Sequence, residues 1–334
     1  MKRIVGYIAI VLGCMVLTLV ACKPKKVLTI DPILQDTITA IMERQMNEIV
    51  AHSGQAIVME VQTGEIKAMV GEGKPQSSGL IRTISLLAAL ESGKVKLSDM
   101  VDTQNGILMV DDEPLKDHNW HRGGYGEITA LKSLMVGSNI GNYQLTQRAF
   151  ENEQAYVDML NKLNYETEEM FTPKDNGWNK KELAWLTIGY NQLVYPFQML
   201  TIYNAIANDG KMVKPMLYKG ETKVINPQIA SKENVDSIQM ALTMVVKEGL
   251  GKPAGSEKVQ VAGATGTSQI SILGEETETK SLMEYSVEFC GFFPADNPKY
   301  SIIVSMNKRG LPASGGLMAG SVFSEIVDFM MERE

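Results

Sequence analysis

The stretch SVEFCGFFPADNPKYSIIVSM, residues 286–306, carries the clearest architectural signal in the chain. Two runs rich in β-branched and aromatic residues, Ser286–Phe293 and Tyr300–Met306, flank a turn with two prolines, an aspartate and an asparagine. This pattern predicts a β-hairpin. A second hairpin is predicted near the start of the chain, where Ala56–Val61 and Ile66–Val70 flank the glycine-containing turn Gln62–Glu65. We therefore expect a sheet that takes strands from both ends of the chain.

Helices are predicted outside both hairpins. Asp31 can cap a helix that begins at Pro32, because proline is tolerated in a first helical turn, and this helix should end near residues 52–54. The chain closes on a second helix, Ser321–Met331, whose apolar residues share one stripe. A further short strand is predicted at Val259–Ala262. These elements indicate an antiparallel sheet with flanking terminal helices.

The middle of the chain is predicted to be mainly helical. Residues 80–92, LIRTISLLAALES, are apolar around most of the helix circumference, so this helix should be buried. Leu183–Ala207 is again apolar and helical, with an interruption at Pro196. We expect one α+β domain over residues 31–334, in which 31–75 and about 185–334 form the α/β part and about 76–184 form the largely helical insertion.

The N-terminus predicts a membrane anchor. Lys2 and Arg3 precede an apolar stretch, Ile4–Ala21, that ends in Leu19-Val20-Ala21-Cys22. This order is typical of a lipoprotein signal peptide over residues 1–22, in which Cys22 is lipidated and residues 23–30 form a basic tether. An uncleaved membrane helix is the alternative, since about 18 apolar residues just suffice to span a bilayer. Both interpretations place the folded part outside the cytoplasm, anchored to a membrane and facing the periplasm.

Charge and cysteine content exclude several classes of function. The formal net charge is −7, and removal of Lys2 and Arg3 with the leader would make it −9, so a nucleic-acid partner is not expected. Cys290 is the one cysteine after Cys22, which leaves no intramolecular disulfide in the folded part. No Cys, His and Asp cluster has metal-ligand spacing. We expect neither a metal nor a cofactor.

Several stretches resemble, in collinear order, the transpeptidase domain of class B penicillin-binding proteins, the enzymes that cross-link peptidoglycan. The resemblance covers roughly residues 28–334. The matching stretches are Leu28–Pro32, Val61–Ile66, Leu87–Val95, Ile188–Tyr190, Pro196–Leu200, Tyr203–Lys211 and Gly291–Tyr300. It implies the fold of that family, extracytoplasmic work on the cell wall, and three catalytic motifs.

The first motif, Ser-x-x-Lys, should begin the buried helix and supply nucleophile and base. It falls on Gly79-Leu80-Ile81-Arg82. Glycine has no side chain to attack with, and arginine, with a pKa above about 12, is not a usable base. Ser78 is a candidate substitute nucleophile, but it has Ile81 where the motif requires lysine. The resemblance therefore implies that the covalent step is lost at this motif.

The other two motifs are also altered. In the second, Ser-x-Asn, Gly137 replaces the serine and Asn139 is kept. In the third, Lys-Thr-Gly, Ala264 replaces the lysine, while Thr265, Gly266 and Thr267 are kept. The resemblance implies that Asn139 and Thr265 would hold a substrate, and that the backbone N–H of Thr267 would form half of an oxyanion hole. These residues are the candidate ligand-binding set, although they could equally persist as supports of the local backbone.

Three functions remain open from the sequence. The first is a catalytically inactive transpeptidase homologue that binds a peptidoglycan stem peptide or a partner protein of cell-wall synthesis or division. The second is an active transpeptidase or carboxypeptidase with a relocated serine, such as Ser78. The third is a structural protein with a vestigial cleft, in which Arg82 occupies the former site. The sequence does not settle whether the chain is an enzyme, but the altered motifs favour a pseudoenzyme.

Overall fold

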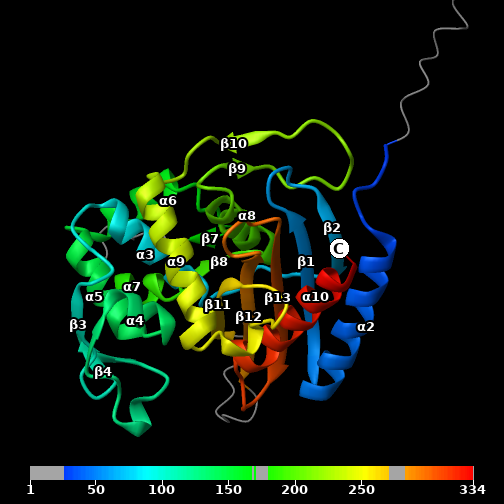
Figure 1. Ribbon diagram of the computed structural model, residues 1–334. Coiled ribbons are helices and arrows are strands. Elements are labelled where there is room, and N and C mark those ends of the chain that lie inside the picture. Colours follow the sequence, from blue (N-terminus) through cyan, green and yellow to red (C-terminus); the bar gives the residue numbers. More distant parts are fainter. Residues whose placement is uncertain (1–25, 168, 171–179, 271–282, 334) are drawn as a thin grey trace, which may run out of the picture.

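The computed structural model describes residues 26–167, 169–170, 180–270 and 283–333 (Figure 1). A five-stranded antiparallel sheet with the order β11-β12-β13-β1-β2 organises these residues. Its strands are β1 (Ala51–Glu60), β2 (Ile66–Gly71), β11 (Ala262–Ile270), β12 (Glu284–Phe293) and β13 (Tyr300–Arg309). β13 pairs with β1, so the two chain ends meet in the middle of the sheet. This confirms the predicted α+β class. The leader 1–22, with Cys22, lies outside the described residues.

The further short strand was predicted too early in the chain. It was expected at Val259–Ala262, but β11 begins at Ala262 and continues to Ile270. The sequence AGATGTSQI is short of strand-favouring residues, and cross-strand pairing with β12 keeps it extended over its whole length. Gly263 is required there, because a Cβ at that position would lie 2.7 Å from the Phe289 ring.

Two terminal helices cover one face of the sheet, as Figure 1 shows on the right of the view. They are α2 (Pro32–Ile49) and α10 (Gly320–Arg333). Asp31 caps α2 as predicted, with Oδ1 accepting from the N–H of Leu34 at 3.0 Å. The expected end of this helix near residues 52–54 was wrong. Val50 takes a left-handed conformation, φ 57°, and β1 begins at the next residue.

The opposite face of the sheet packs against α8 (Pro196–Ala207), with α3 (Ile81–Glu91) and α9 (Lys232–Glu248) beside it. β1 contributes to both cores: Ala56 and Val58 belong to the cluster under α2 and α10, whereas Ile57 and Met59 belong to the larger cluster on the other side. A strand buried on both faces is apolar at successive positions, and this explains the continuous run in β1.

The region between α3 and α8 is helical but also holds short strands. Its helices are α4 (Ala130–Met135), α5 (Asn139–Ala149), α6 (Glu153–Lys162) and α7 (Lys180–Thr187). Short strands pair around them: β3 (Met100–Asp102) with β6 (Glu127–Thr129), β4 (Ile107–Val110) with β5 (Glu113–Lys116), and β7 (Glu169–Met170) with β8 (Gln192–Leu193). The predicted helical stretch Leu183–Ala207 is wrong between residues 188 and 195, because α7 ends at Thr187 and β8 follows before Pro196 begins α8. After α8, β9 (Met212–Val213) pairs with β10 (Val224–Asn226).

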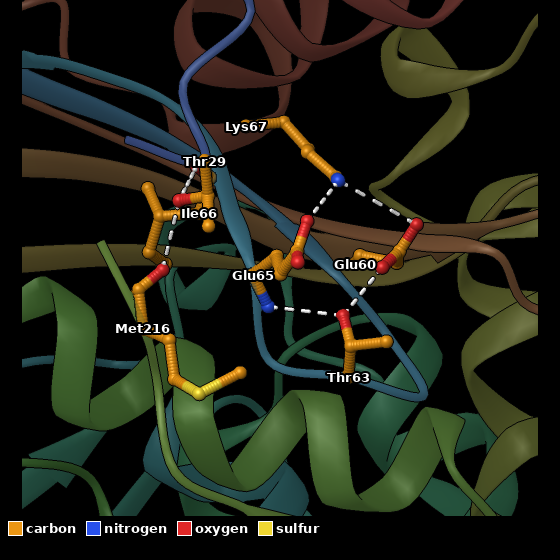
Figure 2. A network of polar contacts seen from close by, with 7 residues as sticks. All are labelled: Thr29, Glu60, Thr63, Glu65, Ile66, Lys67 and Met216. Atoms are coloured by element: carbon orange, nitrogen blue, oxygen red, sulfur yellow. Dashed lines mark hydrogen bonds and ion pairs between the residues drawn. The ribbon is translucent and has the colours of Figure 1, made fainter. Parts of the chain in front are cut away.

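Residues 27–30 belong to the folded body, which corrects their assignment to the tether. Leu28 forms a bridge with Tyr218, and the N–H of Thr29 donates to the Leu217 carbonyl at 3.0 Å. The Thr29 hydroxyl lies between the carbonyls of Ile66 and Met216 (Figure 2). These partners are far away in sequence, so nothing near residue 29 indicates them. In the described part of the chain, no helix is both long and apolar enough to cross a membrane.

Candidate functional site

The side chain of Arg82 lies where the three altered motifs meet. Arg82 is in the first turn of α3, and its Nη1 donates to Asn139 Oδ1 of α5 at 3.2 Å. Its Nη2 donates to the Thr265 carbonyl of β11 at 3.4 Å. A Cβ built on Gly79 would stand 2.9 Å from Nη2 and 3.1 Å from Nη1. The guanidinium therefore occupies the space that a side chain at position 79 would enter.

The second motif forms another wall of the same space. Gly137 has a left-handed φ of 60°, and a Cβ there would lie 3.7 Å from Arg82 Nη2, an ordinary contact distance. Asn139 opens α5, where its Nδ2 donates to the Lys116 carbonyl at 2.9 Å. Both polar groups of the Asn139 amide thus have partners within the protein, Arg82 on one side and Lys116 on the other.

β11 supplies the third wall and is an edge strand of the sheet. The Thr265 carbonyl accepts from Arg82, and the N–H of Gln269 donates to the Tyr190 hydroxyl at 3.1 Å. Both backbone groups therefore point away from β12, at the open edge of the sheet. Because backbone groups alternate in direction along a strand, the N–H of Thr267 points outward as well. The Thr267 hydroxyl accepts from the N–H of Gly315 at 2.9 Å.

The two remaining positions of the third motif face inward. Ala264 is 5% exposed and belongs to the larger hydrophobic core, so it offers the site no charge. Gly266 is buried, and a Cβ at that position would stand 2.8 Å from Glu288 Oε2. The structure thus brings Gly79, Arg82, Gly137, Asn139 and the Thr265 carbonyl around one point, while Ala264 and Gly266 face the buried core that contains Leu80.

Arg82 brings a positive charge into this site without a directly paired carboxylate. Among the described residues, no carboxylate oxygen lies within 4.0 Å of an Arg82 guanidinium nitrogen. Asp117 and Glu288 act on the guanidinium from further away. Burial lowers the pKa of the Arg82 guanidinium from its ordinary value. Arginine starts from a pKa so high that the group stays charged at neutral pH.

Asp117 is a site residue that the sequence did not reveal. Its carboxylate is buried, and it accepts from the Ser138 hydroxyl at 2.8 Å and from the N–H of Ile140 at 3.1 Å. Burial raises the pKa of Asp117, although these donors and the N–H of Asn139 oppose the shift. Ser138 also caps α5 by accepting from the N–H of Gly141 at 2.9 Å. Asp117 therefore anchors the helix end that presents Asn139.

Ser78 lies beneath the site in a buried polar cluster. It is 2% exposed, and its hydroxyl donates to Glu288 Oε2 at 2.7 Å. Gln76 joins the cluster, with Nε2 donating to the Ser286 and Ser305 hydroxyls at 2.7 and 3.0 Å. Burial raises the pKa of Glu288 to about 7 against the effect of these hydrogen bonds. A glutamate inside the apolar run VEFCGFF was a sequence signal for this cluster.

His118 lies beside the second motif, since the Val136 backbone and the Arg82 guanidinium both act on its pKa. His118 Nε2 lies 2.7 Å from the Tyr125 hydroxyl, and burial lowers the pKa of His118. His121 packs edge-on against Trp120 in η1 (Trp120–Arg122) and is exposed. Within the described ranges, no group of three His, Cys, Asp or Glu side chains is arranged to hold a metal ion.

Comparison with known proteins agrees with this fold. The family model described as "Penicillin binding protein transpeptidase domain" matches residues 54–328. Penicillin-binding protein PbpB of Mycobacterium tuberculosis is 25% identical over 360 residues, which cover 92% of this chain and 52% of the relative. Peptidoglycan D,D-transpeptidase FtsI of Escherichia coli is 23% identical and is matched over 91% of this chain and 55% of its own length. The chain thus spans about half the length of these relatives.

Solved structures extend the agreement to three dimensions. The transpeptidase domain of Burkholderia pseudomallei penicillin-binding protein 3 superimposes with a TM-score of 0.80 at 23% identity, covering 93% of this chain and 97% of that one. Penicillin-binding protein 3 of Mycobacterium tuberculosis gives a TM-score of 0.77 at 24% identity, covering 92% and 79%. The family model matches most of the chain, and the relatives and the fold agree with it. This chain therefore belongs to the penicillin-binding protein transpeptidase domain family.

Proposed function

We propose that this protein is a catalytically inactive transpeptidase-domain protein of peptidoglycan synthesis, which acts by binding a partner protein of the cell-wall machinery. We further propose that it faces the periplasm and is anchored to the membrane through lipidated Cys22. The observation that carries the first proposal is the position of Arg82. Its guanidinium stands in the space in front of Gly79, where an acyl carbon would have to approach a nucleophile.

The chemistry supports inactivity at each step. Acyl transfer in this family needs a hydroxyl nucleophile and a nearby base. Position 79 has no side chain, and a permanently protonated guanidinium cannot take a proton at neutral pH. The outward N–H of Thr267 remains as a potential oxyanion donor, but it has no covalent intermediate to stabilise without a nucleophile. Loss of nucleophile or base alone lowers turnover about 10⁶-fold in a serine protease.

Partner binding is favoured over stem-peptide binding by the state of β11. An extended peptide would add to the outer edge of this strand through backbone hydrogen bonds. Arg82 already uses the Thr265 carbonyl, and the Tyr190 hydroxyl already uses the Gln269 N–H. The Asn139 amide is likewise engaged on both sides. A stem peptide would therefore have to displace internal hydrogen bonds before it could form its own.

A relocated nucleophile is disfavoured by burial. Ser78 does have a hydrogen-bonded carboxylate, Glu288, which is the arrangement a serine nucleophile needs. Its 2% exposure, however, leaves no path for an acyl donor. The Ser78 carbonyl is also closely packed, since a Cβ on Gly189 would lie 2.1 Å from it. The pair is better explained as a fixed support under the start of α3.

The decisive test is covalent labelling. Purified full-length protein is incubated with a fluorescent penicillin, denatured and examined on a gel, with Mycobacterium tuberculosis penicillin-binding protein 3, whose solved structures include an ampicillin complex, as the positive control. We expect no band for this protein. A band that survives denaturation and disappears in Ser78→Ala would establish the relocated nucleophile and overturn the proposal.

A second measurement separates partner binding from ligand binding. Soluble peptidoglycan stem peptide is titrated into the protein by calorimetry, in parallel with Asn139→Ala and Thr265→Val. We expect no saturable heat in any of the three. Saturable binding to the parent protein that both substitutions weaken would show that the cleft is a ligand site after all.

A further inference from the structure

The chain enters the folded body through a segment that is held in place. The N–H of Lys219 donates to the Val27 carbonyl at 2.8 Å, and the N–H of Thr29 donates to the Leu217 carbonyl at 3.0 Å. Figure 2 shows the Thr29 hydroxyl between the carbonyls of Ile66 and Met216, at 2.7 and 3.0 Å. The chain therefore leaves the body at Lys26, beside the connection between β9 and β10.

This exit point fixes how far the body can stand from a membrane. Lys26 follows Cys22 by four positions, and an extended chain spans at most about 3.5 Å per residue, or about 14 Å in all. The apolar stretch of an uncleaved anchor ends at Ala21, which gives nearly the same limit. This step rests on the membrane anchor proposed above. Given that anchor, the surface around Lys26 lies close to the lipid headgroups.

The surface around Lys26 is unusual in composition. We define the anchor-side face as Lys26–Leu28 together with Leu217–Ile225. Every residue in both segments is exposed. The face contains three lysines, Lys26, Lys219 and Lys223, against one glutamate, whereas the whole chain has a net charge of −7. It also exposes six large apolar residues: Val27 56%, Leu28 54%, Leu217 41%, Tyr218 47%, Val224 47% and Ile225 43%.

Acidic residues near the face are already paired. Asp31, which lines one cavity with Val27 and Lys219, pairs with Arg333 at 2.9 Å. Glu65 pairs with Lys67 at 2.5 Å, and Glu60 lies 3.7 Å from the same Lys67 and accepts from the Thr63 hydroxyl (Figure 2). On the face itself, Lys26 lies over the Tyr218 ring, 5.2 Å from its centre. The described residues offer Lys219 and Lys223 no ion-pair partner within 4.0 Å. Their charges are available to an external anion.

We propose that the anchor-side face docks on an anionic lipid bilayer, with its lysines at the lipid phosphates and its apolar side chains at headgroup level. Lysines next to a bilayer respond to the negative surface potential, which acts within about one Debye length. Apolar side chains exposed beside basic ones are typical of interfacial binding. Docking would hold the transpeptidase-like body in one orientation on the membrane rather than letting it swing on its anchor.

The test is hydrogen exchange of the full-length protein in nanodiscs. One set of discs contains phosphatidylcholine alone and the other contains 30% phosphatidylglycerol. We expect amides of residues 217–225 to exchange several-fold more slowly in the anionic discs, and this protection to vanish in high salt. Each lysine contributes about 1 kcal/mol near an anionic surface. Lys219→Gln with Lys223→Gln should thus lower the ratio of docked to undocked protein about 30-fold and abolish the protection.

Two control variants keep the test falsifiable. Lys247, in the last turn of α9, and Lys252, four residues beyond that helix, are both exposed. α9 has 17 residues, is about 25 Å long and follows β10 in the chain. Lys247→Gln with Lys252→Gln should leave the protection intact, and Val224→Ser with Ile225→Ser should weaken it without changing charge. Equal exchange in neutral and anionic discs would overturn the proposal, as would protection that the lysine changes leave untouched. Neither outcome bears on penicillin labelling, so the proposed function is tested separately.

Discussion

Serine at position 79 should destabilise the protein because of Arg82. The new Cβ would stand 2.9 Å from Nη2, a distance that real Cβ contacts essentially never show, so the guanidinium must withdraw. Withdrawal breaks the hydrogen bonds to Asn139 Oδ1 and to the Thr265 carbonyl. A hydrogen bond with a charged partner contributes about 1.5–3 kcal/mol. Both bonds are long, at 3.2 and 3.4 Å, so the low end of that range applies. Because the guanidinium ends a flexible side chain that can shift, the expected loss is about 1–3 kcal/mol.

The same reasoning predicts that this loss depends on the residue at position 82. In an Arg82→Ala background, Gly79→Ser meets no guanidinium, and the reduced flexibility of the unfolded chain should make it neutral or slightly stabilising. The coupling between the two positions is therefore expected to be about 1–3 kcal/mol, within the range for residues in contact. Gly220→Ser is a matched control, because the residue is exposed and the nearest atom to a Cβ there would be the Tyr218 carbonyl oxygen at 4.0 Å.

The assay is urea unfolding at pH 7, followed by tryptophan fluorescence, for the parent protein, both single variants, the double variant and the Gly220→Ser control. The free energies of unfolding complete a double-mutant cycle. If Gly79→Ser costs the same with and without Arg82, the guanidinium does not occupy the space in front of Gly79. The structural basis of the proposed inactivity would then fail.

Three further outcomes follow from the described contacts. Glu288→Gln should remove a pH dependence of stability. Because the pKa of Glu288 is raised to about 7, the native state binds more protons than the unfolded state between about pH 4.5 and 7. The free energy of unfolding of the parent protein should therefore fall by about 3 kcal/mol relative to the variant as pH rises through this window, which urea unfolding at pH 5 and pH 8 measures. Thr29→Val should lose about 1–2 kcal/mol and speed hydrogen exchange of residues 27–30, whereas Thr39→Val, which removes a bond within α2, should have a smaller effect in the same measurement. Ser138→Ala removes both the α5 cap and a donor to buried Asp117, so it should lower the melting temperature more than Asn152→Ala, which removes only the exposed cap of α6; equal shifts would mean that the Asp117 contact contributes nothing.

Much of the fold follows from local sequence patterns. The hairpins β1–β2 and β12–β13 and helix α3 were predicted because alternation, turn residues and apolar periodicity all act within a few residues. β11 was misplaced because its small residues carry little strand preference and its position is set by pairing with β12. Helix α9 was not predicted, although Val235, Ile238, Leu242 and Val245 recur at helical spacing.

Some residues of the candidate site could be predicted from local sequence, and others could not. Motif order located Gly79, Gly137, Asn139 and Ala264 in the sequence, since these positions stand at fixed distances from recognisable neighbours. The contacts of Asp117 with Ser138, 21 residues away, and of Ser78 with Glu288, 210 residues away, depend on the finished fold. No spacing within the sequence encodes them. The Arg82 side chain could be suspected of occupying the site, but its hydrogen bonds to both Asn139 and Thr265 required coordinates.

The residues at the altered motif positions fit one another, so the fold does not depend on the motif residues of an active transpeptidase. The absence of a side chain at Gly79 leaves room for the guanidinium, and Arg82 in turn connects α3 to α5 and β11. A serine at 137 would meet no clash, but the backbone there has a left-handed φ of 60°, which disfavours residues with a Cβ. A serine at position 79 or 137 would therefore meet a local structure that suits glycine better. This fit supports the proposed inactivity, because each glycine suits the surroundings that the other altered positions create.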